Sequence, residues 1–73
     1  MRFLNTISQR EQQILRLIAF ELTSKEIAQE LYISTNTVNT HKKNLGDKLD
    51  VRNLAGMVRR GFELGILEAE QRA

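Results

Sequence analysis

The side chains best suited to chemistry lie in residues 34–49, where amides, hydroxyls and amines recur at helical spacing. At about 100° per residue, five polar residues fall on the side away from Val38: Asn36, Asn39, Thr40, Lys43 and Asp47. An Asn amide can pair with adenine, a Lys ammonium with guanine, and a Thr methyl can contact thymine. This face could therefore contact DNA bases, although an ordinary solvated helix face can hold the same residue types.

The segment before this stretch predicts how it is positioned. Thr23 and Glu26 have the spacing of a capping box, which predicts a short helix over 24–31. Only residues 32–34 separate it from a second helix over 35–49, for which Ser34 is a suitable N-cap. Two helices so tightly linked, the second with a polar face, are typical of a helix-turn-helix.

Two further helices are expected to support this pair. Ser8 and Glu11 form another capping box, which predicts a helix over 9–21. Asn53 and Gly65 suit the two ends of a helix over 54–64. The sequence therefore predicts an all-α, compact four-helix domain over 1–73, with its core in 7–67 and a frayed end at 68–73.

The last helix carries two apolar stripes, and so small a domain has little core in which to bury both. We expect one stripe to face the core: Ala55, Val58, Phe62 and Ile66. We assign the other stripe to a homodimer interface: Leu54, Met57, Gly61 and Leu64. The alternative is that scattered apolar residues are simply exposed, as they are on most proteins.

Composition narrows the class of protein without deciding it. Hydrophobic residues make up 41% and charged residues 27% of the chain, as in ordinary globular domains. The net charge is only +2, but basic residues are concentrated between His41 and Arg60, which suits a phosphate-rich partner. On charge alone, an ordinary solvated mixed surface is favoured over a phosphate-binding one. The chain has no cysteine and no apolar run of about 18 residues, so we expect a cytoplasmic protein without a membrane span.

Enzymatic and metal-binding chemistry have little support. His41, the only histidine, has no carboxylate or cysteine one helical turn away, so we interpret it as a packing or DNA-backbone residue. Glu26 and Glu30 are spaced as an exposed helical pair, and no glycine-rich phosphate loop is present. We expect no catalytic site, no metal and no cofactor. The main alternative to DNA binding is a helical protein–protein interaction module, which an apolar face on 35–49 would favour.

Several motifs in register resemble the LuxR/GerE-type DNA-binding domain of bacterial transcription regulators, over about residues 7–67. The matching segments are 7–11, 14–15, 25–28, 33–34, 37–38, His41, 48–49, Val51 and 65–67. The resemblance implies a four-helix domain with a central helix-turn-helix, whose last helix often mediates dimerisation. It implies sequence-specific binding of double-stranded DNA, as a response-regulator output domain or a free-standing regulator, with RNA polymerase as a candidate protein partner.

The resemblance also assigns roles to residues. Base contacts are expected from Asn39, Thr40 and Lys43. Contacts to the DNA backbone are expected from Lys25, Thr35, Asn36, Thr37 and Lys42.

Four positions depart from the family pattern. Glu21 and Asp50 replace common glycines, and Asp tolerates a left-handed backbone better than most residues. Leu54 replaces a common arginine, which favours an apolar interface over a phosphate contact there. Gly46 lies inside the helix over 35–49, where it should weaken the last turn by about 1 kcal/mol relative to Ala.

Overall fold

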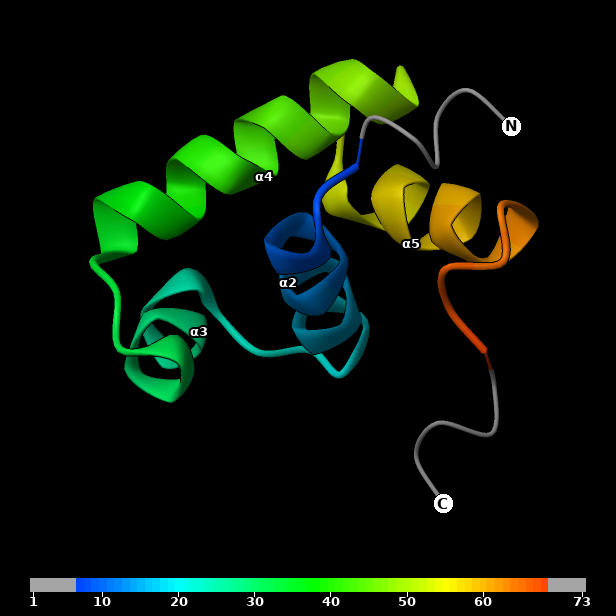
Figure 1. Ribbon diagram of the computed structural model, residues 1–73. Helices are drawn as coiled ribbons and strands as arrows, with labels where there is room; N and C mark the ends of the chain where they lie inside the picture. The colour runs from blue at the N-terminus through cyan, green and yellow to red at the C-terminus, as the bar shows by residue number, and fades with distance from the viewer. Residues whose placement is uncertain (1–6, 69–73) are drawn as a thin grey trace.

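Four helices form in the computed structural model, which describes residues 7–68 (Figure 1). They are α2 (Gln9–Ala19), α3 (Ser24–Leu31), α4 (Thr35–Leu49) and α5 (Leu54–Glu63). No strand occurs in these residues, so the all-α prediction is confirmed. Apart from Glu68, the expected frayed end at 68–73 lies outside the described residues.

The predicted caps begin all four helices. The Ser8 hydroxyl accepts from the Glu11 backbone N–H at 3.0 Å, and the Glu11 carboxylate accepts from the Ser8 N–H at 3.0 Å. Thr23 and Glu26 repeat this reciprocal pair at the start of α3. Ser34 and Asn53 cap α4 and α5 with single side-chain acceptors. Local hydrogen-bonding chemistry therefore defined the helix starts correctly.

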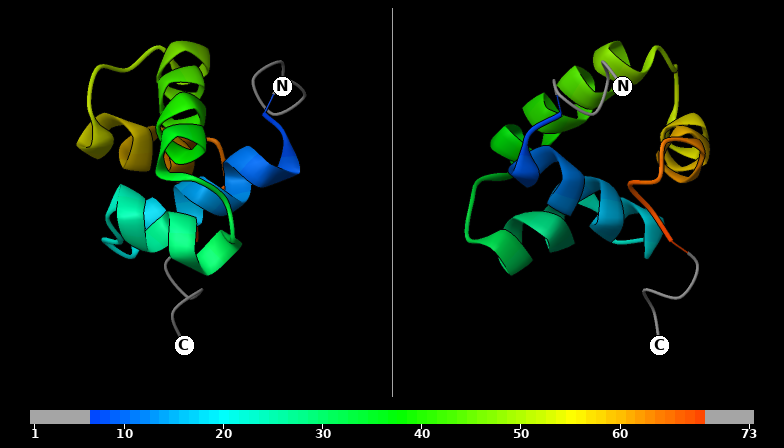
Figure 2. Two further views of the ribbon diagram at one scale, coloured as in Figure 1. Left: turned by 90° about the vertical axis from the view of Figure 1, so that its left-hand side faces the viewer. Right: turned by 45° about the vertical axis from the view of Figure 1, so that its right-hand side comes forward.

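Helix α4 contacts each of the other three helices, whereas α3 and α5 do not contact one another within residues 7–68. Figure 2 shows α4 along one edge of the molecule, with its outer side clear of the other helices. Its inner side is anchored by Val38, Leu45 and Leu49, which are at most 1% exposed. They pack in one core with Ile14 and Leu15 of α2. The polar side of α4 is therefore turned outward by burial of the opposite side.

Left-handed backbone marks three turns. Glu21 (φ 70°), Tyr32 (φ 57°) and Asp50 (φ 58°) lie after α2, α3 and α4 respectively. Asp50 confirms the expectation that Asp can occupy this conformation, and Gly65 (φ 78°) does so after α5. The expected end of the first helix at residue 21 is wrong, because Glu21 is left-handed and α2 stops at Ala19.

The last turn of α4 forms despite Gly46, and the helix continues to Leu49. Gly46 is buried, and a Cβ there would lie 3.4 Å from both the Met57 side chain and the Val51 carbonyl oxygen, which is ordinary van der Waals contact. The expected cost of about 1 kcal/mol relative to Ala stays a prediction.

The assignment of the two α5 stripes is wrong in part. Of the expected core stripe, Ile66 is buried and Val58 packs against the core, as predicted. Met57 is 6% exposed and Gly61 is buried, so both face this chain's own core and not a partner. Phe62 is instead 48% exposed, and Ala55 is exposed. Two residues of the expected dimer stripe keep some surface, since Leu54 is exposed and Leu64 half-buried.

One ion pair joins α2 to the C-terminal part of α4. The Lys48 ammonium lies 2.8 Å from the buried Glu11 carboxylate. Burial by itself raises the pKa of Glu11, but the hydrogen bonds from Lys48 and the Ser8 backbone, with the Lys48 and His41 charges, hold that pKa below its ordinary value. Glu11 thus both caps α2 and fixes α4, which extends the structural role expected from its capping position.

Candidate nucleic-acid interface

The polar face of α4 consists of Asn36, Asn39, Thr40, Lys43 and Asp47, and all five are exposed. The structure therefore brings the three expected base-contacting residues together on one surface. Their helix is rigidly supported, because its opposite side is fully buried. A surface of amides, hydroxyls and one ammonium can form directional hydrogen bonds to base edges.

Four of the five side chains of this face have partners within the molecule, and these partners define what the side chains can offer. The Lys43 ammonium lies 3.4 Å from the Asp47 carboxylate in an exposed pair. The Thr40 hydroxyl donates to the Asn36 backbone carbonyl at 3.0 Å. Thr40 thus uses its only hydroxyl proton within the helix, and its methyl and oxygen lone pairs are what it can present outward.

Asn39 is linked to α3 through a residue that sequence reasoning missed. The Ser24 hydroxyl donates to Asn39 Oδ1 at 2.8 Å and accepts from the Lys42 ammonium at 2.6 Å. Burial lowers the pKa of Lys42, one of the expected DNA-backbone contacts, which is half-buried here. The helix-turn-helix pattern in the sequence could have indicated a role for Ser24, because this motif places the start of α3 against the middle of α4.

The remaining expected backbone contacts lie near two helix starts. Thr35 and Thr37 are exposed in the first turn of α4, and Lys25 is exposed in the first turn of α3. The Thr37 hydroxyl lies 2.8 Å from that of its N-cap, Ser34. Helix starts attract phosphate through unpaired backbone N–H groups and the helix dipole. These positions suit phosphate chemistry at the edges of the polar face.

The basic concentration seen in the sequence is partly neutralised inside the molecule. Lys48 pairs with Glu11, while Arg59 and Arg60 pair with Glu63 at 3.2 and 2.9 Å. Hydrogen bonds from these arginines hold the pKa of Glu63 below its ordinary value. Among the described residues, Arg10, Lys25 and Arg52 are exposed cations without an ion pair. Charge counted along the sequence therefore overstated the basic surface available to phosphate.

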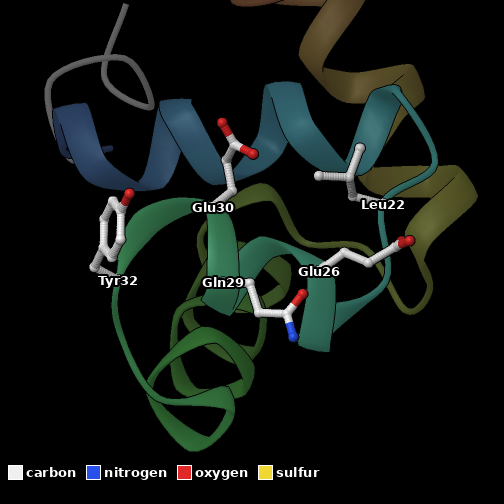
Figure 3. A pocket seen from close by; sticks show the side chains of 5 residues that line it. All are labelled: Leu22, Glu26, Gln29, Glu30 and Tyr32. Atoms are coloured by element: carbon white, nitrogen blue, oxygen red, sulfur yellow. The ribbon is translucent and has the colours of Figure 1, made fainter.

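A pocket of about 400 Å³ lies along α3 (Figure 3). Its lining is Leu22, Glu26, Gln29, Glu30 and Tyr32. The two carboxylates make this pocket unfavourable for a phosphate backbone. Residues 7–68 contain no group of three metal-ligating side chains and no helix long and apolar enough to cross a membrane.

Comparison with known families gives a match to bacterial regulatory proteins of the luxR family over residues 5–60. The chain is similar to the uncharacterized response regulatory protein YgeK of Escherichia coli, at 40% identity over 62 residues. That match covers 85% of this chain and 42% of YgeK. The spore germination protein GerE of Bacillus subtilis is 37% identical over 62 residues, with 85% of this chain and 84% of GerE covered.

The fold is also similar to that of a solved response regulator, ChrA of a heme-sensing two-component system. The TM-score is 0.82 at 29% sequence identity, and the match covers 85% of this chain and 31% of ChrA. The chain thus spans less than half the length of YgeK and ChrA, and most of the length of GerE.

Proposed function

The chain belongs to the luxR family of bacterial regulatory proteins, and on that premise we propose how it recognises specific double-stranded DNA. DNA binding in transcription regulation follows from the family and from relatives that are named transcriptional regulatory proteins. The proposal is that α4 lies in the major groove, where its polar face contacts base edges.

The observation that carries this proposal is the contrast between the two sides of α4. Val38, Leu45 and Leu49 are at most 1% exposed, while the five residues of the polar face are all exposed. A helix held so firmly on one side can present amides and hydroxyls at a fixed angle. Hydrogen bonds to bases require such fixed geometry, whereas an apolar groove of a partner protein would require apolar side chains.

Asn39, Thr40 and Lys43 are proposed to contact bases. Lys43 must leave Asp47 to reach a guanine, but an exposed pair of this kind contributes only about 0–1 kcal/mol. The Thr40 methyl is available for a thymine methyl because its hydroxyl is bound to the helix backbone. Contacts to phosphate are proposed for Lys25, Thr35, Asn36, Thr37 and Lys42.

We further propose that two copies bind as a homodimer through α5, with revised contacts. Leu54 and Phe62 are 45% and 48% exposed, and Val58 between them is half-buried. At a spacing of four residues they form one line along the helix, named here the α5 stripe. Two copies joined in this way would place α4 in successive major grooves about 34 Å apart, on an inverted-repeat site.

Other parts of the proposal rest on family membership alone. Transcription regulation from DNA brings the chain near RNA polymerase, and a contact between them stays a prediction. A cytoplasmic location, a purely non-enzymatic role and the absence of a cofactor belong to the same proposal.

The proposal is tested by selecting bound sequences from a random duplex pool at two salt concentrations. We expect enrichment of an inverted repeat. The base preference of its half-sites should persist as salt rises, while overall affinity should fall because salt weakens the contacts to phosphate. Enrichment of a single half-site would remove the dimer but keep base recognition. No enrichment, with all binding lost at moderate salt, would contradict specific recognition and favour a protein-binding module.

A further inference from the structure

Ser24 connects two residues of the proposed interface across the helix-turn-helix. Its hydroxyl oxygen lies 2.8 Å from Asn39 Oδ1 and 2.6 Å from Lys42 Nζ, although the partners are 15 and 18 residues away in sequence. Asn39 and Lys42 are one turn apart on α4, while Ser24 is the first residue of α3. One hydroxyl therefore joins the base-contacting helix to its neighbour.

The chemistry of Lys42 determines one of these two hydrogen bonds. A lysine ammonium has only donors, so Ser24 must accept from Lys42. In the structure the single hydroxyl proton of Ser24 is donated to the amide oxygen of Asn39, although its second lone pair could accept from Nδ2 if the amide were turned over. The nearby ammonium favours the same orientation, because it attracts the negative end of the amide dipole.

The Lys42 ammonium is well placed to maintain this arrangement. Lys42 lines an apolar groove together with Ile18, Leu22, Leu54 and Val58, among others. Its aliphatic stem can lie along these side chains while its charged end reaches Ser24. Within residues 7–68, the Ser24 hydroxyl is the hydrogen-bond partner of this ammonium. Lys42 is thus held by its surroundings in a way that the 78%-exposed Lys43 side chain is not.

Orientation of the amide decides which base edge Asn39 can satisfy. With Oδ1 bound to Ser24, the amide nitrogen Nδ2 lies on the other side of the group and has no partner among the described residues. A donor needs an acceptor on the base. In the major groove adenine and thymine each offer one acceptor and guanine offers two, whereas cytosine offers an amine donor. Adenine satisfies both groups, because its N7 accepts from Nδ2 while its amine donates to the second lone pair of Oδ1; the cytosine amine could satisfy only Oδ1 and would leave Nδ2 unpaired.

We propose that Ser24 is a specificity-determining positioning residue, which orients the Asn39 amide so that α4 selects a base with a major-groove acceptor and rejects cytosine. This inference rests on the proposed function, because it concerns the base contact made by Asn39. Without the hydroxyl, the amide can rotate by half a turn and present its oxygen to the cytosine amine. Discrimination is lost at one base pair, while the phosphate contacts remain.

The test compares wild type, Ser24→Ala, Ser24→Thr and Asn39→Ala on the selected half-site with every base at every position. We expect Ser24→Ala to lower discrimination against cytosine roughly tenfold at one position, the same position at which Asn39→Ala loses preference. Ser24→Thr keeps the hydroxyl and should restore the wild-type profile. Gln29→Ala, an exposed change on α3, is the matched control and should leave the profile unchanged.

A uniform loss of affinity at every position, or an unchanged profile for Ser24→Ala, would overturn the positioning role. If wild type selects no sequence at all, the proposed function fails and this inference fails with it. A measurement without DNA separates the two: NMR relaxation of the Asn39 side-chain amide. We expect this amide to be ordered in wild type and mobile in Ser24→Ala, and equal order in both would also overturn the inference. Thermal unfolding verifies that each variant is folded.

Discussion

Helices α4 and α5 are both amphipathic, yet their exposed sides offer opposite chemistry. The outer side of α4 carries amides, hydroxyls and charges, and four of its side chains are already linked to neighbouring groups: Asn39, Thr40, Lys43 and Asp47. The outer side of α5 carries the line of Leu54, Val58 and Phe62. Polar groups with fixed partners suit directional contacts to bases, and an apolar line suits contact with another apolar surface.

The way the two helices are anchored differs too. Three large side chains hold α4, each at most 1% exposed, and the Glu11–Lys48 pair adds a polar link to α2. Helix α5 is held by Met57 and by close approach at Gly61, where an added Cβ would lie 2.7 Å from the Leu67 side chain. The side of a helix that remains exposed for binding is therefore decided by the residues that anchor it, and not by the composition of its surface.

The largest expected effect comes from Met57→Glu. Met57 is 6% exposed, so a carboxylate there would be buried without a partner, and we expect a loss of about 3–5 kcal/mol in unfolding free energy. Urea unfolding followed by circular dichroism measures it. A folded, stable Met57→Glu protein that fails only to self-associate would restore Met57 to the dimer interface.

Phe62→Glu is the matched change on the exposed side of the same helix. Phe62 is 48% exposed, so stability should change by less than about 1 kcal/mol. Affinity for a single half-site should be unaffected, while the extra affinity for two half-sites should fall. Unaltered cooperativity on the double site would remove the α5 stripe from the dimer.

The next effect concerns the polar anchor of α4. Glu11→Gln removes the charge that Lys48 pairs with, and we expect a loss of about 1.5–3 kcal/mol at neutral pH. This loss of stability should be smaller than for a fully buried ion pair, because the Lys48 side chain is 34% exposed. Denaturant unfolding of both proteins at several pH values measures it.

The stabilisation that Glu11 contributes should decrease as pH falls. The folded protein holds the pKa of Glu11 below its ordinary value of 4.5, so the stabilisation is complete above that value and is lost as pH falls through the folded pKa. Wild type should therefore lose stability more steeply than Glu11→Gln on acidification, and the two curves should converge. Parallel curves would show that the ionised carboxylate contributes nothing.

A comparable effect, on binding alone, is expected for Lys43→Ala. Loss of a base contact should weaken specific DNA binding by about 1–3 kcal/mol and relax preference at one position. Stability should barely change, since the Lys43 and Asp47 side chains are 78% and 71% exposed. Competition binding measures the affinity for the selected duplex and the affinity for random duplexes. Equal losses on the two duplexes would make Lys43 a phosphate contact instead.

The smallest effect is expected at the turn that leads into α4. Tyr32 is left-handed and 94% exposed, so Tyr32→Gly relieves backbone strain and loses almost no buried surface. We expect a gain of up to about 1 kcal/mol in unfolding free energy, from thermal unfolding. A destabilised Tyr32→Gly protein would indicate that the ring makes contacts that matter to the turn.

The sequence by itself determined the helix starts and the outer side of α4. Capping pairs such as Ser8 with Glu11 are local, so their spacing predicts a hydrogen bond that also forms in the structure. The sequence also predicted which side of α4 faces solvent. Its large apolar residues occur on one side only, so only one orientation of the helix buries them. The family resemblance, carried by motifs over most of the chain, is confirmed by the match over residues 5–60.

Only the tertiary structure decided the orientation of α5 and the link through Ser24. Helix α5 has apolar residues on two sides, so periodicity allows two orientations, and the close approach at Gly61 favours the one that buries Met57. The Ser24 link joins residues 15 and 18 positions apart, at a distance set by the packing of α3 on α4. Local patterns specify hydrogen bonds within a turn, whereas contacts between helices depend on how side-chain volumes fit together.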